Sequence, residues 1–296
     1  MLQHHPVQNS SHCSLNFLKS IDPKSNQLDS LSMCMSYGKH VGVNRVSNGS
    51  SFIDKDILAF ESLLQIHVND ERITSLLGTP RQLEELYVGH LFSEGYGDFR
   101  ETKITLSHEN ELSYKIYGHG ELTKDTNLPT LVTTSCGACD GENLLELNEG
   151  IQHFTHPHLD YNHNELFAAL LDMKSSQLGF QQTGGMHAAA LWNHEVGLQC
   201  LSEDIGRHNA VDKSIGSGLI SRIDLSKQFL LLSGRCGWDI VAKAARSGIG
   251  SIVSIGACSS LAADTARELG LRIFSFMRQD SCVIIGALNH FPNENP

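Results

Sequence analysis

The second half of the chain alternates short, mostly apolar runs with stretches of helical periodicity, and this rhythm limits the folds open to it. The runs Phe229–Leu232 and Ile252–Ile255 have the length and composition of strands buried on both faces. Strands that alternate with helices form a sheet covered by helices, so we expect a three-layer α/β domain. The other expected elements here are the helices His208–Ile220, Trp238–Ser247 and Leu261–Leu269 and the strands Ile273–Phe276 and Val283–Ile285.

Two further elements are expected just upstream of this alternation. Asn164–Met173 has the spacing of an amphipathic helix. Ala188–Trp192 and Val196–Leu201 predict a hairpin that turns at Asn193-His194-Glu195. The sheet is therefore expected to be mixed.

The N-terminal 50 residues have a different character. They are rich in Ser, Asn, His and Gly and show no sustained periodicity. Such composition favours a flexible arm over residues 1–50, with at most one short strand around Met33–Tyr37. We expect regular structure to begin near Phe52.

Residues 51–135 predict a small α+β domain ahead of the larger one, which we place at 136–296. Leu63–Val68 alternates like a strand and Asn69-Asp70 indicates a turn. Thr79–Gln82 resembles a helix start, with Thr79 as cap and Gln82 completing a capping box, and Gly95 is a plausible helix end. A hairpin is expected from Lys103–Leu106 and Leu112–Tyr117.

Charge and composition exclude several classes of protein. The chain has 296 residues and a net charge of −11, with no basic stripe of the kind that nucleic-acid binding needs. No apolar stretch approaches the roughly 20 residues of a membrane span, and the N-terminus lacks the pattern of a secretory signal. We expect a cytoplasmic protein that binds neither nucleic acid nor membrane.

Cys136 and Cys139 form a Cys-x-x-Cys motif in a small-residue, polar setting, at the predicted junction between the domains. Two thiols at this spacing can exchange with each other, carry a sulfur atom or chelate a metal. A zinc site usually needs about four ligands, and the other cysteines are scattered singly, although His187 or His208 could in principle supply the remaining ligands. We therefore expect no metal, and the motif alone leaves redox exchange and sulfur transfer open.

Four other polar groups are candidates for a binding site. Gly184-Gly185 permits close backbone approach by a ligand, and His187 follows it. Arg207 and His208 open an expected helix whose N-terminal amides can bind an anion, and we favour this over the alternative that Glu203–Lys213 is a capped surface helix with local ion pairs. Arg235 and Arg278 follow expected strands, the usual ligand edge of α/β sheets, and with Arg207 they predict a phosphate-binding face.

These motifs resemble those of the FdhD/NarQ family of formate dehydrogenase accessory sulfurtransferases. The similarity spans about Glu61 to Gly286 and includes Phe92–Gly95. The motifs that occur in the family's order are Ser135–Cys139, Thr183–Leu191, Glu203–Lys213 and Ser233-Gly234-Arg235. The resemblance implies a cytidine-deaminase-like domain beside a smaller α+β one, and a homodimer.

The resemblance also implies a function. A family member would carry persulfide sulfur from a cysteine desulfurase to the molybdenum bis(molybdopterin guanine dinucleotide) cofactor of a client formate dehydrogenase. Cys136 matches the persulfide carrier, whereas the role of Cys139 stays open. The residues that match the cofactor-binding stretch are Phe276, Met277, Arg278, Gln279, Asp280 and Ser281.

The sequence departs from the family pattern at two places, and two other functions are alternatives to sulfur transfer. Gln279–Ser281 lacks the family's glycine and basic residue, and Cys236 stands where a small non-thiol residue is usual. One rival is a cofactor-binding chaperone that moves no sulfur. The other is a zinc deaminase, but Ser135 replaces the proline of its Pro-Cys-x-x-Cys and the upstream His-x-Glu is missing.

Overall fold

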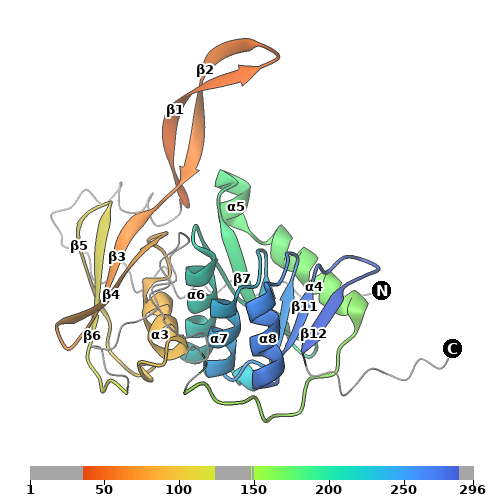
Figure 1. The fold of residues 1–296 in the computed structure, drawn as a ribbon. Helices are drawn as coiled ribbons and strands as arrows, with labels where there is room; N and C mark the ends of the chain where they lie inside the picture. The colour runs from red at the N-terminus through yellow and green to blue at the C-terminus, as the bar shows by residue number, and fades with distance from the viewer. Residues whose placement is uncertain (1–35, 124–147, 149, 287–296) are drawn as a thin grey trace.

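A computed structural model describes residues 36–123, 148 and 150–286 of the protein, and a six-stranded mixed sheet lies at its centre (Figure 1). The strand order is β12-β11-β10-β9-β7-β8. Strands β9, β10 and β11 are parallel, β12 is antiparallel to β11, and β7 runs antiparallel to both β8 and β9. The bounds are β7 His187–Asn193, β8 Gly197–Asp204, β9 Phe229–Leu232, β10 Ser251–Ser254, β11 Arg272–Ser275 and β12 Val283–Gly286.

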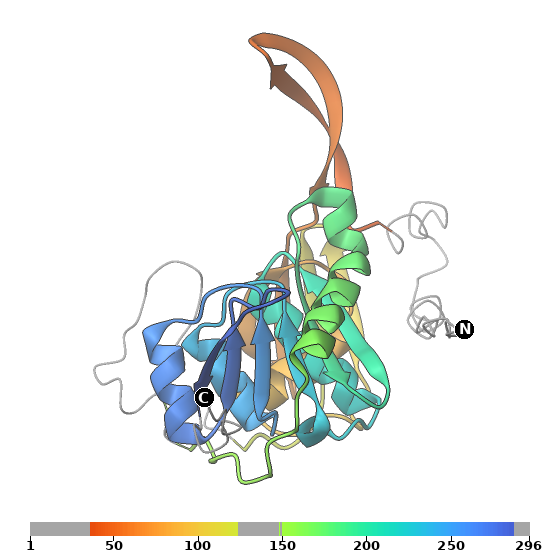
Figure 2. The same cartoon turned by 90° about the vertical axis from the view of Figure 1, so that its right-hand side faces the viewer.

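Helices cover both faces of this sheet. Helices α6 (Arg207–Ile220), α7 (Trp238–Arg246) and α8 (Ser260–Leu269) pack on one face, and α4 (His163–Ser175) packs on the other (Figures 1 and 2). Strand β9 shows why its sequence is apolar throughout: successive side chains point to opposite faces, so Leu230 joins one core and Leu231 joins the other. This confirms the α/β prediction. A specific kinship to cytidine deaminases stays a prediction.

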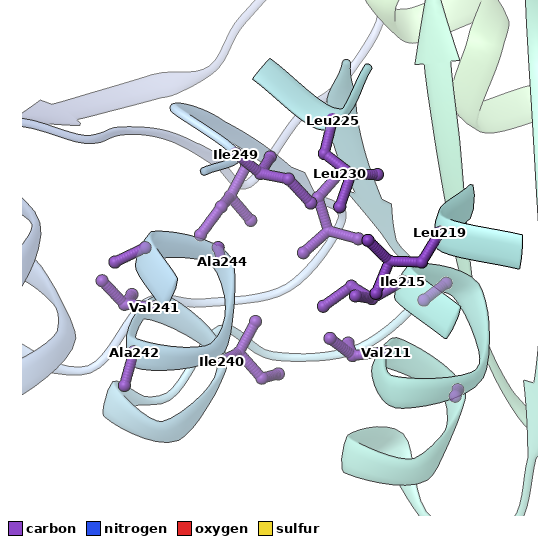
Figure 3. Close-up of a cluster of buried hydrophobic side chains, with 14 of the residues drawn as sticks. Val211, Ile215, Leu219, Leu225, Leu230, Ile240, Val241, Ala242, Ala244 and Ile249 are labelled. Carbon is purple, nitrogen blue, oxygen red and sulfur yellow. The ribbon is translucent and has the colours of Figure 1, made fainter. Parts of the chain in front are cut away.

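The core under α6 and α7 is aliphatic and tightly interleaved. Val211 and Ile215 of α6, Ile240 of α7 and Leu230 of β9 are all buried and lie in one cluster (Figure 3). Full burial of each such side chain contributes about 1.5–3 kcal/mol relative to exposure. This cluster holds the first turns of α6 and α7 in place at the edge of the sheet.

A second sheet lies beside α3 (Leu83–Ser93) and has the order β4-β3-β6-β5. Helix α3 crosses α6 very closely, because a Cβ added at Gly89 would lie 1.8 Å from the carbonyl oxygen of Asp212. One continuous buried cluster therefore spans both sheets. The proposed domain division at 135/136 stays a prediction. The strands are β3 Ser62–Val68, β4 Glu71–Gly78, β5 Thr105–Asn110 and β6 Ser113–Gly118.

A long hairpin corrects the prediction that regular structure begins near Phe52. Strands β1 (Gly38–Ser47) and β2 (Ser50–Ala59) pair antiparallel and project from the body of the protein (Figures 1 and 2). Asn48 and Gly49 have φ of 52° and 79°, and an Asn-Gly turn of this kind is a strong hairpin signal. Polar composition outweighed that signal in the prediction of an arm over residues 1–50, of which 1–35 lie outside the described residues.

The start of α3 was also predicted wrongly, although the helix exists and Gly95 follows its end with φ of 80°. The residue before the helix is Gln82, in the left-handed conformation and without a side-chain cap. Thr79 is used elsewhere: its Oγ1 donates to the carbonyl of Phe60, and its amide donates to Asp204 Oδ2 at 3.0 Å. Thr79 therefore forms long-range hydrogen bonds in place of the predicted local capping box.

Most other elements match their predicted ranges within about two residues. The sequence did not predict α5 (Leu178–Thr183) or the short 3-10 helix η2 (Leu225–Lys227). Strand β4 was also missed, although its turn at Asn69-Asp70 was expected. No helix within the described ranges is long and apolar enough to cross a membrane.

Candidate functional site

The sheet topology brings the predicted polar motifs to one edge. Because β8, β9, β10 and β11 end there while β7 begins there, five loops that are distant in sequence meet. We call it the carboxyl edge, and ligands of open α/β sheets usually bind at such an edge. The loops cover residues 184–187, 205–208, 233–237, 255–259 and 276–282.

A pocket of about 330 Å³ opens at this edge, on the side of α4 and α5. Gly184, Gly185 and His187 line it together with Ser233 and Lys174. Gly184 ends α5 with φ of 68°, and no atom lies within 4 Å of the position of a Cβ there. The glycine pair therefore leaves the backbone accessible here, and its predicted role in ligand binding stays a prediction.

His187 is held in place at the wall of this pocket. It begins β7, opposite Asp204 of β8, and the next amide, that of Ala188, donates to Ser233 Oγ at 2.8 Å. Burial lowers the pKa of the His187 imidazole, and the positive charges of Arg207 and Arg235 lower this pKa further. The ring is therefore neutral at pH 7 and presents both a donor and an acceptor.

Arg207 and Arg235 carry positive charges close to His187. Within the described part of the chain, neither Arg207 nor Arg235 forms a hydrogen bond or an ion pair through its guanidinium, and Arg235 is exposed. Two unpaired arginines beside one histidine are unusual in a chain of net charge −11. Guanidinium groups bind phosphate through paired hydrogen bonds, so this arrangement suits a phosphorylated ligand.

A second, apolar pocket of about 190 Å³ adjoins the first and shares Lys174 and Ile255 with it. Met277 and Arg278 line this second pocket. The Arg278 guanidinium donates to the carbonyl of Ile255 at 2.9 Å, which ties the loop after β11 to the loop after β10. The two pockets place His187 and Arg278 along one continuous surface.

Phe276 has an uncommon conformation within this surface. Its φ is 51°, a left-handed value that is strained for a bulky residue, and its side chain is 48% exposed. The backbone is fixed on both sides, because the Phe276 amide donates to the Gly256 carbonyl and the Met277 amide donates to the Ser254 carbonyl. Such strain persists where surrounding structure imposes it, often at binding sites.

Residues 279–281 complete a tight exposed turn after Arg278. The Arg278 amide donates to the Ser281 carbonyl at 2.8 Å, and His163 Nε2 contacts the carbonyls of Arg278 and Gln279. Asp280 adds a negative charge to the turn. The turn therefore offers backbone groups and a hydroxyl to a ligand, but no cation beyond Arg278.

Several charged residues of the cluster Glu203–Lys213 form buried structural contacts. Glu203 accepts hydrogen bonds from the amides of Gly179 and Phe180 at the start of α5. Asp204 accepts from the Gly206 amide and pairs with the completely buried Lys213 at 2.5 Å. The surface-helix alternative was wrong for Lys213, whose partner is a strand residue in the protein interior.

The His208 side chain contacts a carboxylate on the neighbouring helix α7. Its Nε2 pairs with the Asp239 carboxylate in the first turn of α7. Burial lowers the pKa of His208, as do the charges of Arg207 and Lys243, whereas Asp239 acts in the opposite direction. This contact joins the N-terminal turns of α6 and α7, and a cofactor-binding role for His208 stays a prediction.

The predicted pair Cys136 and Cys139 lies outside the described residues, so their roles stay predictions. Among the residues that are described, no cluster of three His, Cys, Asp or Glu side chains is arranged to hold a metal ion. One lining residue was missed from the sequence. Lys174 reaches both pockets from the last turn of α4, where a lysine is ordinarily explained by the helix dipole.

Comparison with known proteins decides the family. The FdhD/NarQ family model matches residues 59–288, which include every loop of the carboxyl edge. The chain belongs to the FdhD/NarQ family. This membership confirms the resemblance inferred from the motifs.

Individual relatives agree with the family match over most of both chains. A protein of Sulfolobus acidocaldarius named sulfur carrier protein FdhD is 33% identical over 247 residues, covering 82% of this chain and 94% of its own length. A protein of the same name from Mycolicibacterium paratuberculosis is 32% identical over 257 residues, which cover 81% of this chain and 93% of its own length. A crystal structure of a formate dehydrogenase accessory protein from Desulfotalea psychrophila has a TM-score of 0.64 at 27% identity, and covers 85% of this chain and 98% of that one.

Proposed function

We propose that this protein is a sulfur carrier that transfers persulfide sulfur from a cysteine desulfurase to the molybdenum bis(molybdopterin guanine dinucleotide) cofactor of a formate dehydrogenase. The names of the relatives support the general role. The observation that carries the proposal is the convergence of His187, Arg207, Arg235, Arg278 and Phe276 at one edge of the sheet. We further propose that it acts in the cytoplasm as a homodimer.

The chemistry of the carboxyl edge suits a guanine dinucleotide as substrate. Arg207 and Arg235, which have no ion-pair partner within the described ranges, provide cations for phosphate oxygens, and the Gly184-Gly185 backbone permits close approach. The exposed ring of Phe276 is available for stacking on a base, an interaction worth about 1–3 kcal/mol. The ligand would therefore span both pockets, with Lys174 between them.

Sulfur transfer requires a thiolate that attacks the terminal sulfur of a donor persulfide. We assign this step to Cys136, which becomes a persulfide while the donor leaves as a thiolate. Cys139 would then either displace the sulfur as sulfide or only shape the loop. His187 and the arginines would orient the cofactor and stabilise negative charge, without exchanging sulfur themselves.

The test combines activity with direct detection of the carrier. Cys136→Ala is expected to abolish formate dehydrogenase activity in a strain that depends on this protein, while Cys200→Ala, which removes a thiol in the middle of β8 and outside the carboxyl-edge loops, retains it. Mass spectrometry of the wild-type chain after incubation with a desulfurase and cysteine should show one added sulfur on the Cys136 peptide. Full activity of Cys136→Ala would refute the proposal. Activity loss without any adduct would instead favour the chaperone that binds cofactor and moves no sulfur.

A further inference from the structure

Two cysteines that are distant in sequence stand side by side at the carboxyl edge. Cys236 and Cys258 are partners in an isolated parallel β-bridge, just beyond the ends of β9 and β10. The Cys236 amide donates to the Ala257 carbonyl at 2.9 Å, and the Ser259 amide donates to the Cys236 carbonyl at 3.1 Å. Two backbone hydrogen bonds therefore hold these positions in register.

The geometry suits a reversible bond between the two sulfur atoms. Neighbouring strands lie about 4.8 Å apart, and a disulfide joins Cα atoms separated by roughly 4.4–6.8 Å. Paired residues of a bridge point to the same side of the sheet. Both cysteines are free thiols, and their side chains are hydrogen-bonded to each other.

The two thiols differ in access and in acidity. Cys236 is buried, with 1% of its surface exposed, whereas Cys258 is partly exposed. The hydrogen bond from Cys236 lowers the pKa of Cys258, helped by the charge of Arg267, although burial acts in the opposite direction. The same hydrogen bond and burial raise the pKa of Cys236 well above its usual value. The accessible thiol therefore ionises first.

Two helix N-termini support negative charge at this place. Cys236 directly precedes Gly237, the N-cap of α7, and Cys258 directly precedes Ser259, the N-cap of α8. Helix N-termini stabilise thiolates and lower their pKa. The site is also next to the proposed cofactor surface, since Cys236 follows Arg235 and Ile255 of the Cys258 loop lines both pockets.

We propose that Cys236 and Cys258 form a second sulfur-accepting site that takes sulfane sulfur from a persulfide donor. The proposal rests on the sulfur-carrier function and adds a site to it. Cys258 is the attacking thiolate, and Cys236 is the buried thiol that releases the sulfur from it.

The two steps balance as thiol–disulfide exchanges. In the first, Cys258 Sγ bonds to the terminal sulfur of the donor persulfide, the donor S–S bond breaks and the donor leaves as a thiolate. In the second, Cys236 Sγ bonds to Cys258 Sγ, the S–S bond of the Cys258 persulfide breaks and hydrogen sulfide leaves with the Cys236 proton. The sulfane sulfur gains two electrons, which the two thiols lose as they form a disulfide. A dithiol reductant restores the pair.

The experiment uses the full chain with Cys136→Ser and Cys139→Ser, so that the motif cannot contribute. This protein is incubated with glutathione persulfide, sulfide is measured, and peptides are mapped by mass spectrometry. With the pair intact, we expect a Cys236–Cys258 disulfide and released sulfide. Adding Cys236→Ser should stop sulfide release and leave one extra sulfur on Cys258. Adding Cys258→Ser should abolish both products.

Cys282 is the internal control, because it is a partly exposed thiol whose pKa burial raises. A Cys258 peptide modified no more than that of Cys282 in the Cys236→Ser variant would overturn the proposal. A Cys258 persulfide that persists while Cys236 is present would also overturn it. Either failure leaves the Cys136 test unaffected, because that test follows the Cys136 peptide in the wild-type chain.

Discussion

Charged side chains at the start and in the middle of helix α6 (Arg207–Ile220) have opposite environments. In the middle, Asp212 is buried with Lys243 of α7, whose Nζ lies 2.8 Å from Asp212 Oδ1 and 2.5 Å from Glu94 Oε1. At the start, Arg207 stands with Arg235 without an acidic partner in the described part of the chain. Asp212, Glu94 and Lys243 compensate one another where α3, α6 and α7 meet, whereas positive charge is left available at the carboxyl edge among the described residues.

The protonation behaviour of the buried cluster shows how strongly it is coupled. Burial opposes ionisation of Glu94, but the charges of Lys243 and His90 outweigh it and hold the pKa of Glu94 at about 2. Burial likewise opposes the charge of Lys243, yet Asp212 and Glu94 raise the pKa of Lys243 well above its usual value. This comparison teaches that the interior cluster joins helices, while the edge is free to bind an anion.

The largest effect is expected from breaking the buried cluster. Lys243→Met removes the buried cation that Asp212 and the half-buried Glu94 share, and loss of one partner of such a pair costs about 3–5 kcal/mol of unfolding free energy. Lys227→Met is the control, because Lys227 is exposed and pairs with Asp224 on the surface, an interaction worth about 0–1 kcal/mol. Urea unfolding followed by tryptophan fluorescence measures both. Equal losses in the two variants would contradict the proposed difference between interior and surface charge.

An intermediate effect is expected at the edge, on binding and not on stability. Arg235→Gln should weaken the binding of guanosine diphosphate about tenfold, the equivalent of about 1.4 kcal/mol for one charge-assisted hydrogen bond. Its unfolding free energy should change by less than about 0.5 kcal/mol, because Arg235 is exposed and no contact with a described residue is lost. Isothermal calorimetry gives the affinity. The matched control is Arg222→Gln, an exposed arginine paired with Glu101, which should bind as the wild type does.

The smallest effect is expected in the titration of His187. Its pKa in the folded chain lies below the usual value of about 6.5, so the unfolded chain takes up this proton first as the pH falls. The stability that depends on neutral His187 is complete above about pH 6.5 and is lost as the pH falls through the folded pKa. NMR of the imidazole should show its pKa rising in Arg207→Gln, because one opposing charge is removed. An unchanged midpoint would place Arg207 away from the ring.

Local sequence patterns predicted much of this fold. Phe229–Leu232 and Ile252–Ile255 were predicted as buried strands from their apolar composition, and β9 and β10 occupy nearly those ranges. The wrong predictions also came from considering only a few neighbouring residues. Thr79 had every feature of a helix cap, but its amide and hydroxyl were taken by Asp204 and Phe60, partners that no short window of sequence contains.

The candidate site was predictable as a set of motifs but not as a surface. Gly184, His187 and Arg278 were each marked by their place next to an expected strand, and the topology brought them to one edge. Nothing in the local sequence distinguished Lys174 from an ordinary helix lysine, because its place at the site depends on the packing of α4 beside that edge. The separation of half-buried Arg207 from fully buried Lys213, six residues later, depends on which face of α6 meets α3.

By itself, the sequence determined the alternation of strands and helices, the positions of the turns and the family to which the chain belongs. These follow from spacing and residue type, which act over a few residues. The tertiary structure alone decided that Asp212 meets Lys243, that Arg207 pairs with no acid among the described residues and that Cys236 lies next to Cys258. Such contacts join segments far apart in the chain, and they depend on the order in which six strands pair and on the burial that this pairing imposes.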